Sequence, residues 1–166
     1  MLKIFGKGKV TPIYSPFKGE VIQIEKINDP TFSKKMLGDG VGVIPVDGNI
    51  YSPADGKIYS IFPTKHIIAI ETTGGAEFLI HMGIDTISLK GVGYELKVKP
   101  GMNVKRGDIL GFMDINTIKS SGKDITCPVI ATDLSEFYIN ILKDNGNVDI
   151  SDVLFELIKK LQESAL

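Results

Sequence analysis

Short strand-like segments separated by turn residues dominate this chain, and they limit the folds that it can adopt. The segments are rich in β-branched and aromatic residues, while glycine, proline and aspartate punctuate the stretches between them. Short strands at such spacing are typical of an antiparallel β-sandwich or barrel, in which tight turns join neighbouring strands. We therefore predict an all-β fold, with strands near residues 21–24, 41–44, 57–62, 67–70 and 78–80.

An internal repeat adds to this prediction. Residues 14–24 align with residues 51–61, and the pattern Tyr-Ser-Pro-x-x-Gly-x-aliphatic recurs in place. Proline and glycine at fixed offsets form the same turn, and this turn starts the same strand. Two copies are too few for a solenoid. We therefore expect a sandwich built from duplicated half motifs, with two related halves packed into one β structure.

Helix signals are few. Residues 32–37 are expected to form one helical turn, and residues 115–119 and 134–142 are expected to form short helices. The clearest helical pattern is at the C-terminus, where Ser151 can cap a helix at about residues 151–163. The apolar stripe of that helix would contain Leu154, Leu157, Ile158 and Leu161.

Length and composition narrow the class of protein. The 166 residues fit one domain, residues 1–166. The net charge of −1 argues against the basic face that attracts nucleic acids and anionic membranes. Residues 1–12 are expected to be flexible, with at most weak membrane-surface contact, because no segment has the length of a signal peptide or transmembrane helix. The single cysteine, Cys127, indicates a soluble protein of a reducing, cytoplasmic setting and is predicted to be a buried thiol.

The two histidines, His66 and His81, flank two apolar runs and the turn signal Thr-Thr-Gly-Gly at residues 72–75. A hairpin centred between Thr73 and Gly74 places the two histidines directly opposite each other, with Cβ atoms roughly 4.5–5.5 Å apart. A bulge in the turn would shift the register by one residue and move one histidine to the other face.

Two adjacent imidazoles on an apolar patch allow three interpretations. They are a pair without a chemical task, or two metal ligands that require a third, or a nucleophile beside a hydrogen-bond donor that stabilises the new anion. A neutral imidazole has a free lone pair and needs little activation. The candidates for a third metal ligand are Asp39, Asp85 and Glu77, and the sequence has no HExxH pattern.

One segment narrows this choice. Residues 78–91, Phe-Leu-Ile-His-Met-Gly-Ile-Asp-Thr-Ile-Ser-Leu-Lys-Gly, closely resemble the active-site segment of the glucose-type enzyme IIA family of the phosphoenolpyruvate-dependent sugar phosphotransferase system. The resemblance covers about residues 13–132 and includes residues 35–41, 51–56, 62–66 and 104–108. It implies an antiparallel β-sandwich with duplicated halves. It also implies a phosphoryl carrier, which is a phosphotransferase component that uses no cofactor.

The resemblance assigns roles to the histidines and their neighbours. His81 would accept the phosphoryl group, His66 would hydrogen-bond the bound group, and Thr64 would orient His66. Asp29 and Asp85 match family carboxylates that meet an arginine of the phosphocarrier HPr, although Asp85 can also cap a turn and Asp29 precedes a proline. The apolar patch around the histidines would comprise Phe32, Phe62, Leu79 and Ile87, whose simpler role is ordinary core.

The implied partners are phospho-HPr as donor and the IIB domain of a sugar permease as acceptor. A phosphorylation-dependent regulatory binding module is the alternative function. We expect a free-standing monomer, because a carrier must expose the same patch to successive partners. The motifs do not identify the sugar, and zinc bridging His66 and His81 would be adventitious rather than a cofactor.

Two features depart from the family pattern. Asp133 stands where asparagine is usual, and the predicted C-terminal helix replaces a strand that is common in the family. A zinc hydrolase of the lysostaphin-like class is the remaining rival. His81 and Asp85 imitate half of its ligand set, HxxxD, but an HxH motif occurs nowhere in the chain.

Overall fold

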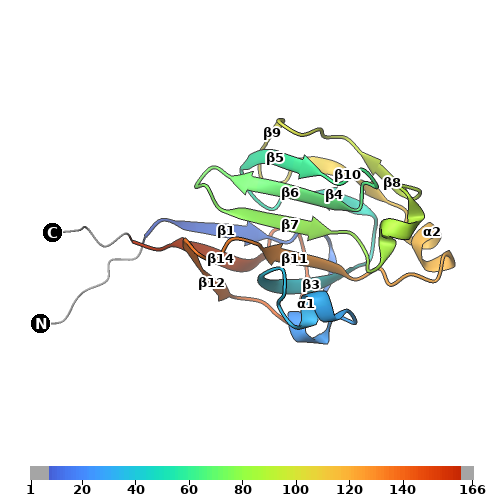
Figure 1. Ribbon diagram of the computed structural model, residues 1–166, viewed down its shortest axis with the longest axis horizontal. Coiled ribbons are helices and arrows are strands. Elements are labelled where there is room, and N and C mark those ends of the chain that lie inside the picture. Colours follow the sequence, from blue (N-terminus) through green and yellow to red (C-terminus); the bar gives the residue numbers. More distant parts are fainter. Residues whose placement is uncertain (1–7, 162–166) are drawn as a thin grey trace, which may run out of the picture.

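The computed structural model describes residues 8–161 and shows a largely β protein (Figure 1). The main sheet has eight strands in the order β13-β2-β3-β11-β7-β6-β5-β9. All of its ladders are antiparallel, which confirms the predicted all-β antiparallel fold. Its strands are β2 (Gly19–Gln23), β3 (Asp39–Pro45), β5 (Gly56–Ile61), β6 (Ile67–Thr72), β7 (Glu77–His81), β9 (Asn103–Val104), β11 (Cys127–Ala131) and β13 (Asn147–Val148).

Two smaller antiparallel sheets complete the fold, with strand orders β1-β14-β12 and β4-β10-β8. The first contains β1 (Val10–Tyr14), β12 (Phe137–Ile141) and β14 (Val153–Lys159). The second contains β4 (Asn49–Tyr51), β8 (Tyr94–Leu96) and β10 (Ile109–Met113). The predicted strands around residues 21–24, 41–44, 57–62, 67–70 and 78–80 correspond to β2, β3, β5, β6 and β7.

The strand order shows the two related halves. One half contains β4 to β10, and the other contains β1 to β3 and β11 to β14. When β1, β2 and β3 are matched to β4, β5 and β6, and β11 to β14 are matched to β7 to β10, each small sheet maps onto the other. The eight-stranded sheet then reads the same from both ends, with the β7–β11 ladder at its centre. The prediction of duplicated halves is therefore confirmed.

The repeated turns connect the two halves. The Tyr14 amide donates to the carbonyl of Pro53, 3.0 Å away, and the Tyr51 amide donates to the carbonyl of Pro16, 2.9 Å away. In both turns the serine hydroxyl donates to the carbonyl of the residue two positions later. Each copy of the motif thus satisfies a backbone group of the other copy, so the repeat joins the halves as well as starting a strand.

One apolar core serves both halves. Its largest fully buried side chains include Phe17, Phe78, Phe155, Ile58 and Met113. Cys127 is fully buried among these residues, and burial raises the pKa of its thiol to about 12. The prediction of a buried structural thiol is confirmed, because a thiol with such a pKa stays protonated and unreactive.

Helices are short and lie outside the sheets. α1 (Pro30–Ser33) begins two residues earlier than predicted, because Asp29 caps it by accepting a 2.8 Å hydrogen bond from the Thr31 amide. α2 (Ile115–Ser120) confirms the helix predicted at 115–119. Two 3-10 turns, η1 (Ile24–Lys26) and η2 (Thr86–Leu89), precede α1 and follow β7. No helix of residues 8–161 is long and apolar enough to cross a membrane.

Two of the helix predictions are wrong. Residues 134–142 contain β12, in which apolar and polar residues alternate along the strand. Residues 153–159 form β14, which pairs with β1 on one edge and β12 on the other. These ladders outweigh the leucine stripe that suggested a helix, since tertiary pairing overrides weak local propensity. Residues 162 and 163 lie outside the described residues.

The expected flexible segment does not extend to residue 12. Val10, Thr11 and Pro12 belong to β1 and pair with Ile158, Leu157 and Glu156 of β14. The apolar Ile13 that follows is fully buried. Residues 1–7, where weak membrane contact was expected, lie outside the described residues.

Candidate functional site

The β6–β7 hairpin carries His81, in a register that differs by one residue from the prediction. Ile67, not His66, lies opposite His81. The loop has three residues rather than two, because the Gly75 amide donates to the carbonyl of Thr72 at 2.8 Å and Gly75 has a φ of +88°. A turn followed by a left-handed glycine is the usual three-residue hairpin loop. A bulge in this turn is the alternative considered from the sequence, and the one-residue shift in register is the result expected from it.

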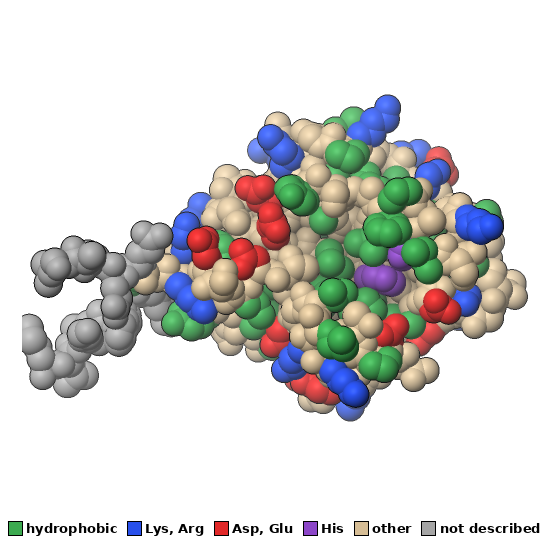
Figure 2. All heavy atoms as spheres, in the orientation of Figure 1, with side chains coloured by type: hydrophobic (Ala, Val, Ile, Leu, Met, Phe, Trp, Pro, Cys, Tyr) green, Lys and Arg blue, Asp and Glu red, His purple; other side chains and the backbone are tan. Residues whose placement is uncertain are grey.

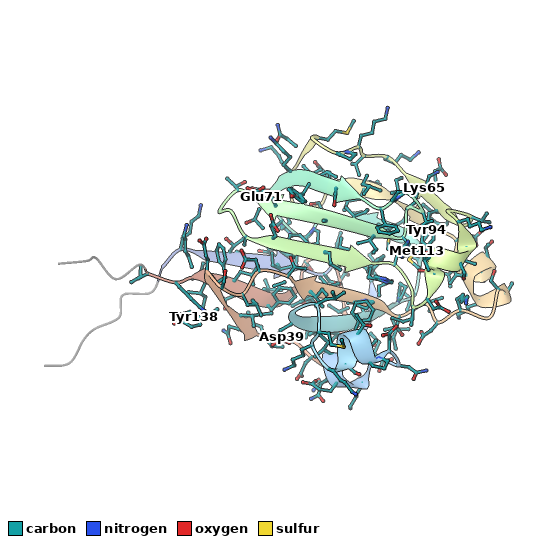
Figure 3. All side chains as sticks on the ribbon, in the orientation of Figure 1. Asp39, Lys65, Glu71, Tyr94, Met113 and Tyr138 are labelled. Carbon is teal, nitrogen blue, oxygen red and sulfur yellow. The ribbon has the colours of Figure 1, made fainter. Side chains whose placement is uncertain are left out.

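The two imidazoles nevertheless lie together. Their ring centroids are 5.0 Å apart and the rings are nearly perpendicular. His66 precedes β6 and is reached through Lys65, which has a φ of +62° and donates its amide to the carbonyl of Phe62 at 2.7 Å. The Met82 amide donates to the carbonyl of His66 at 2.7 Å, so the pairing with the β7 side continues as far as His66. Figure 3 shows Lys65 and Glu71 at opposite ends of β6.

One hydrogen bond fixes the tautomer of His81. Its Nδ1 lies 2.6 Å from the carbonyl oxygen of Gly83. A carbonyl can only accept, so Nδ1 carries the proton and donates it. Burial lowers the pKa of His81 below its ordinary value, against the opposing effects of Gly83 and Asp29. The ring is therefore neutral near pH 7, and Nε2 has a free lone pair that can attack an electrophile.

The segment after His81 is held by bonds that sequence reasoning did not assign. The carbonyl of Met82 accepts from the hydroxyl of Tyr94 at 2.5 Å and from the hydroxyl of Thr86 at 2.9 Å. Gly83 has a φ of +86°, which L side chains rarely adopt. The sequence did contain one signal of this backbone conformation, the glycine that follows His-Met in residues 78–91, because a positive φ favours glycine.

Replacement of Gly83 by alanine is expected to destabilise the fold by more than the roughly 1–3 kcal/mol that a strained backbone residue costs by itself. Its Cβ would lie 2.6 Å from Cγ2 of the fully buried Thr86, which cannot move away. Urea unfolding of this variant measures the loss. The control is Gly75→Ala, which has a similar φ but no atom within 4 Å of the new Cβ. An equal loss in both variants would show that the contact with Thr86 has no effect.

Thr64 contacts His66 through its side chain. The Thr64 hydroxyl lies 2.6 Å from Nδ1 of His66. Burial, reinforced by the neighbouring His81, lowers the pKa of His66 to about 4. His66 is only 3% exposed and is neutral near pH 7, so one ring nitrogen carries the proton. When the hydroxyl donates to Nδ1, that proton is on Nε2.

The free energy of unfolding is expected to fall as the pH is lowered from about 6.5 toward 4. In this window the unfolded chain binds a proton on His66 that the folded chain excludes, since the folded pKa is about 4 and the ordinary value is 6.5. One such proton contributes up to about 1.4 kcal/mol per pH unit. Unfolding measured at several pH values tests this. His66→Leu should show a smaller slope than the wild type, and identical slopes would contradict the low pKa.

An apolar surface surrounds the imidazoles (Figure 2). Phe32 meets His81 edge-on with ring centroids 4.9 Å apart, and Phe62 meets His66 edge-on at 5.2 Å. Leu79 is half-buried two residues before His81, on the same face of β7. Phe62 and Ile87 are 43% and 48% exposed, whereas Phe32 is 3% exposed. Of the four residues of the predicted patch, Phe32 is therefore a core residue, and the other three are at least partly exposed on the protein surface.

The two predicted carboxylates lie in different local settings. Asp29 is half-buried, caps α1, and is close enough to His81 to favour its charged form. Asp85 is exposed, has a φ of +56°, and makes no capping hydrogen bond to the turn that it starts. Its carboxylate instead pairs with the ammonium of Lys123 at 2.9 Å. The suggested turn-capping role of the Asp85 side chain is therefore wrong.

The metal interpretation lacks a ligand set. Among residues 8–161, no three His, Cys, Asp or Glu side chains are grouped so that they could hold a metal ion. Of the third ligands considered, Asp85 pairs with Lys123, and Asp39 contacts Lys35 at 3.7 Å. Glu77 lies opposite Glu71, at the other end of the hairpin from His81.

Comparison with known proteins identifies the family. Residues 11–137 match the family model described as phosphoenolpyruvate-dependent sugar phosphotransferase system, EIIA 1. The chain belongs to this EIIA family. It is 42% identical over 134 residues to the PTS system glucose-specific EIIA component of Staphylococcus epidermidis, which covers 78% of this chain and 81% of that protein. It is 39% identical over 160 residues to the Staphylococcus aureus protein of the same name, with coverage of 91% and 96%.

A solved EIIA structure has the same fold. The glucose permease IIA from Mycoplasma capricolum matches with a TM-score of 0.84 and 34% sequence identity, over 90% of this chain and 96% of that chain. The C-terminal strand β14 agrees with the strand that is common in the family, whereas the leucine pattern of this chain predicted a helix there. As an EIIA component, the protein is a phosphoryl carrier of the sugar phosphotransferase system. It exchanges the phosphoryl group with HPr and with a IIB or permease component.

Proposed function

We propose that Nε2 of His81 accepts the phosphoryl group and that His66 stabilises it there. The hydrogen bond from Nδ1 of His81 to the Gly83 carbonyl, 2.6 Å long, supports this proposal most strongly. It leaves Nε2 as the unprotonated nitrogen of a ring whose centroid lies 5.0 Å from that of the second imidazole. Family membership favours this carrier role over a purely regulatory binding module.

The transfer step balances without a cofactor. Nε2 of His81 attacks the phosphorus of the donor phosphohistidine, and the donor P–N bond breaks as the new P–N bond forms in line with it. The His81 ring gains positive charge during attack. The Nδ1–H bond to the Gly83 carbonyl then becomes charge-assisted and therefore stronger. Gly83 thus supports the developing charge without itself moving a proton.

His66 supplies a neutral donor to the product. In this proposal the Thr64 hydroxyl, 2.6 Å from Nδ1 of His66, donates to that nitrogen and leaves the ring proton on Nε2. The Nε2–H group then donates to a phosphoryl group on the adjacent His81 ring. Because burial lowers the pKa of His66 to about 4, this donor is uncharged near pH 7. A neutral donor holds the phosphoryl group without the strong ion pair that a cation would form, which suits a group that must leave again.

Replacing Thr64 by valine is expected to slow phosphoryl donation to a IIB domain about tenfold, the lower end for loss of a residue that orients a catalytic imidazole. Valine keeps the shape but removes the bond that fixes the His66 tautomer. The rate of transfer from purified phosphorylated protein measures this loss. Thr64→Ser retains the hydroxyl and should restore the rate. A valine variant with the wild-type rate would remove Thr64 from the mechanism.

The surface around the histidines suits a partner with an apolar face and a cation. Phe62, Leu79 and Ile87 present apolar area that excludes water from the phosphoramidate. We propose that Asp29 and Asp85 meet the arginine of HPr. Asp85 must then exchange its bond to Lys123 for one to the partner. Both carboxylates also repel the dianionic phosphoryl group, which favours its onward transfer.

The remaining assignments follow the relatives. Since the matched proteins are named glucose-specific, we propose glucose or a closely similar sugar as the transported substrate. We further propose that residues 1–166 act as one monomeric EIIA domain in the cytoplasm, where HPr and the IIB domain reach the same surface in turn. Phosphorylation-dependent binding of other proteins would use that surface too.

Incubation with phosphoenolpyruvate, enzyme I and HPr tests the function. Intact-mass measurement should show one added phosphoryl group, which acid removes and base preserves. Addition of a glucose IIB domain should then discharge it. Absence of the added mass, with donors shown to phosphorylate another EIIA protein, would contradict the carrier role.

A further inference from the structure

A surface cavity lies far from the histidines, and the phosphoryl carrier mechanism does not use it. It has a volume of about 340 Å³ and lies between β1, the β6–β7 turn and the second repeated turn. His81 ends β7, whereas the β6–β7 turn lies at the opposite end of this hairpin (Figure 1). The volume is within the range of roughly 300–1,000 Å³ found for small-ligand sites.

Two cationic side chains line this cavity. Arg106 is the only arginine of the sequence, and its guanidinium carbon lies 4.1 Å from the centroid of the Tyr14 ring. Contact with the ring holds the guanidinium in place, and the N–H edge of a guanidinium can make two parallel hydrogen bonds to an oxyanion. Lys9 is the second cation, and its backbone is held by the Lys159 amide, which donates to the Lys9 carbonyl at 3.0 Å.

The rest of the lining does not neutralise these charges. Asp55 is the one carboxylate that residues 8–161 contribute to the cavity, and its Oδ1 accepts a 2.8 Å hydrogen bond from the backbone amide of Arg106. Within the described part of the chain, neither Lys9 nor the Arg106 guanidinium is among the ion pairs. Thr11 and Thr73 add hydroxyl donors. The lining therefore combines two cations and two neutral donors with one carboxylate that already accepts a bond.

We propose that this cavity binds a small phosphate monoester through Arg106 and Lys9. A dianionic phosphate fits the arrangement, since a guanidinium fork binds two of its oxygens and an ammonium binds the third. The cavity is small, so a sugar-sized organic group is the largest that it accommodates. Free inorganic phosphate carries the same charged group as a phosphate monoester. The two ligands differ because only the monoester has an organic group that can contact the cavity. The inference does not depend on the role of His81.

Amide NMR of the unphosphorylated protein, titrated separately with inorganic phosphate and glucose-6-phosphate, tests the proposal. We expect saturable shifts of Gly74 and Arg106 with both probes, and the ester to bind more tightly if its sugar contacts the cavity. Arg106→Gln should weaken binding at least about tenfold, because the charge-assisted fork is lost. Lys97→Gln removes a cation from an exposed ion pair with Glu95 and should change nothing.

Two results would overturn the proposal: no saturable shifts at Gly74 and Arg106, or equal affinities for wild type and Arg106→Gln. Shifts confined to the residues around His81 would also overturn it, because they would place the anion at the histidines. Thermal unfolding of Arg106→Gln checks that the variant is folded. The carrier assay with HPr is a separate readout, so failure of one assignment does not imply failure of the other.

Discussion

Replacement of His81 by alanine is expected to abolish phosphoryl acceptance while leaving the fold intact. The structure offers no substitute nucleophile, because the only other histidine has its Nδ1 against the Thr64 hydroxyl and its ring packed against Phe62. His81 is half-buried at the end of β7, so its truncation leaves the ladders with β6 and β11 unchanged. Intact mass after incubation with phosphoenolpyruvate, enzyme I and HPr measures acceptance.

The control for this experiment is the His66→Leu variant, treated in parallel. It keeps His81 and should gain one phosphoryl group. A phosphoryl group on His81→Ala, at the rate of the wild type, would show that another residue is the acceptor. Thermal unfolding of both variants separates loss of the acceptor from loss of the fold.

The His66→Leu variant is expected to accept the phosphoryl group but to pass it on about 10²–10³-fold more slowly, the usual cost of removing one preorganised donor to a developing charge. Leucine fills the volume of the imidazole and makes no hydrogen bond to the phosphoryl oxygens. We expect His66 to donate most strongly to the phosphoryl oxygens in the transition state of transfer to the IIB domain, so its loss slows this step. Single-turnover transfer from the phosphorylated variant to a IIB domain measures the effect.

This second prediction has its own contradicting result. If the variant donates at the wild-type rate, the contact between His66 and His81, 5.0 Å between ring centroids, has no role in transfer. If the His66→Leu variant lost phosphoryl acceptance from HPr as well as donation to the IIB domain, His66 would be required for the acceptance step too.

The sequence predicted that the two histidines are adjacent but not how they become adjacent. The apolar runs and the Thr-Thr-Gly-Gly turn correctly indicated a hairpin, since strand periodicity and turn chemistry are local properties. The register depended on whether Gly74 or Gly75 adopts the left-handed conformation, and composition alone does not distinguish them. Lys65, directly before His66, has a φ of +62°, and no residue pattern indicates this because lysine rarely adopts it.

The repeated turns were predictable, whereas the C-terminal strands were not. The Tyr-Ser-Pro pattern is the same in both copies, and its physical role is local. In β14, Leu154 and Leu157 fit a helical stripe as well as a strand face, and only the flanking strands β1 and β12 determine the outcome. Pairing with distant segments cannot be derived from the local spacing of leucines. The resemblance to enzyme IIA carried the better indication here, because the family commonly ends in a strand.

The hydrogen bonds that hold the segment after His81 could not be predicted from the sequence. Tyr94 lies 12 residues after Met82 and donates to its carbonyl. The Gly83 carbonyl that fixes the His81 tautomer is a backbone group, and backbone groups have no signature in a sequence. Residue types therefore indicated the chemistry, whereas the proton position on His81 required the geometry.

The nitrogen that carries the phosphoryl group is the most direct test of the account. NMR of ¹⁵N-histidine-labelled protein, phosphorylated through HPr, detects the nitrogen that couples to phosphorus. We predict coupling to Nε2 of His81, with Nδ1 of the same ring still protonated and bonded to the Gly83 carbonyl. Coupling to Nδ1 of His81, or to either nitrogen of His66, would contradict the proposed mechanism.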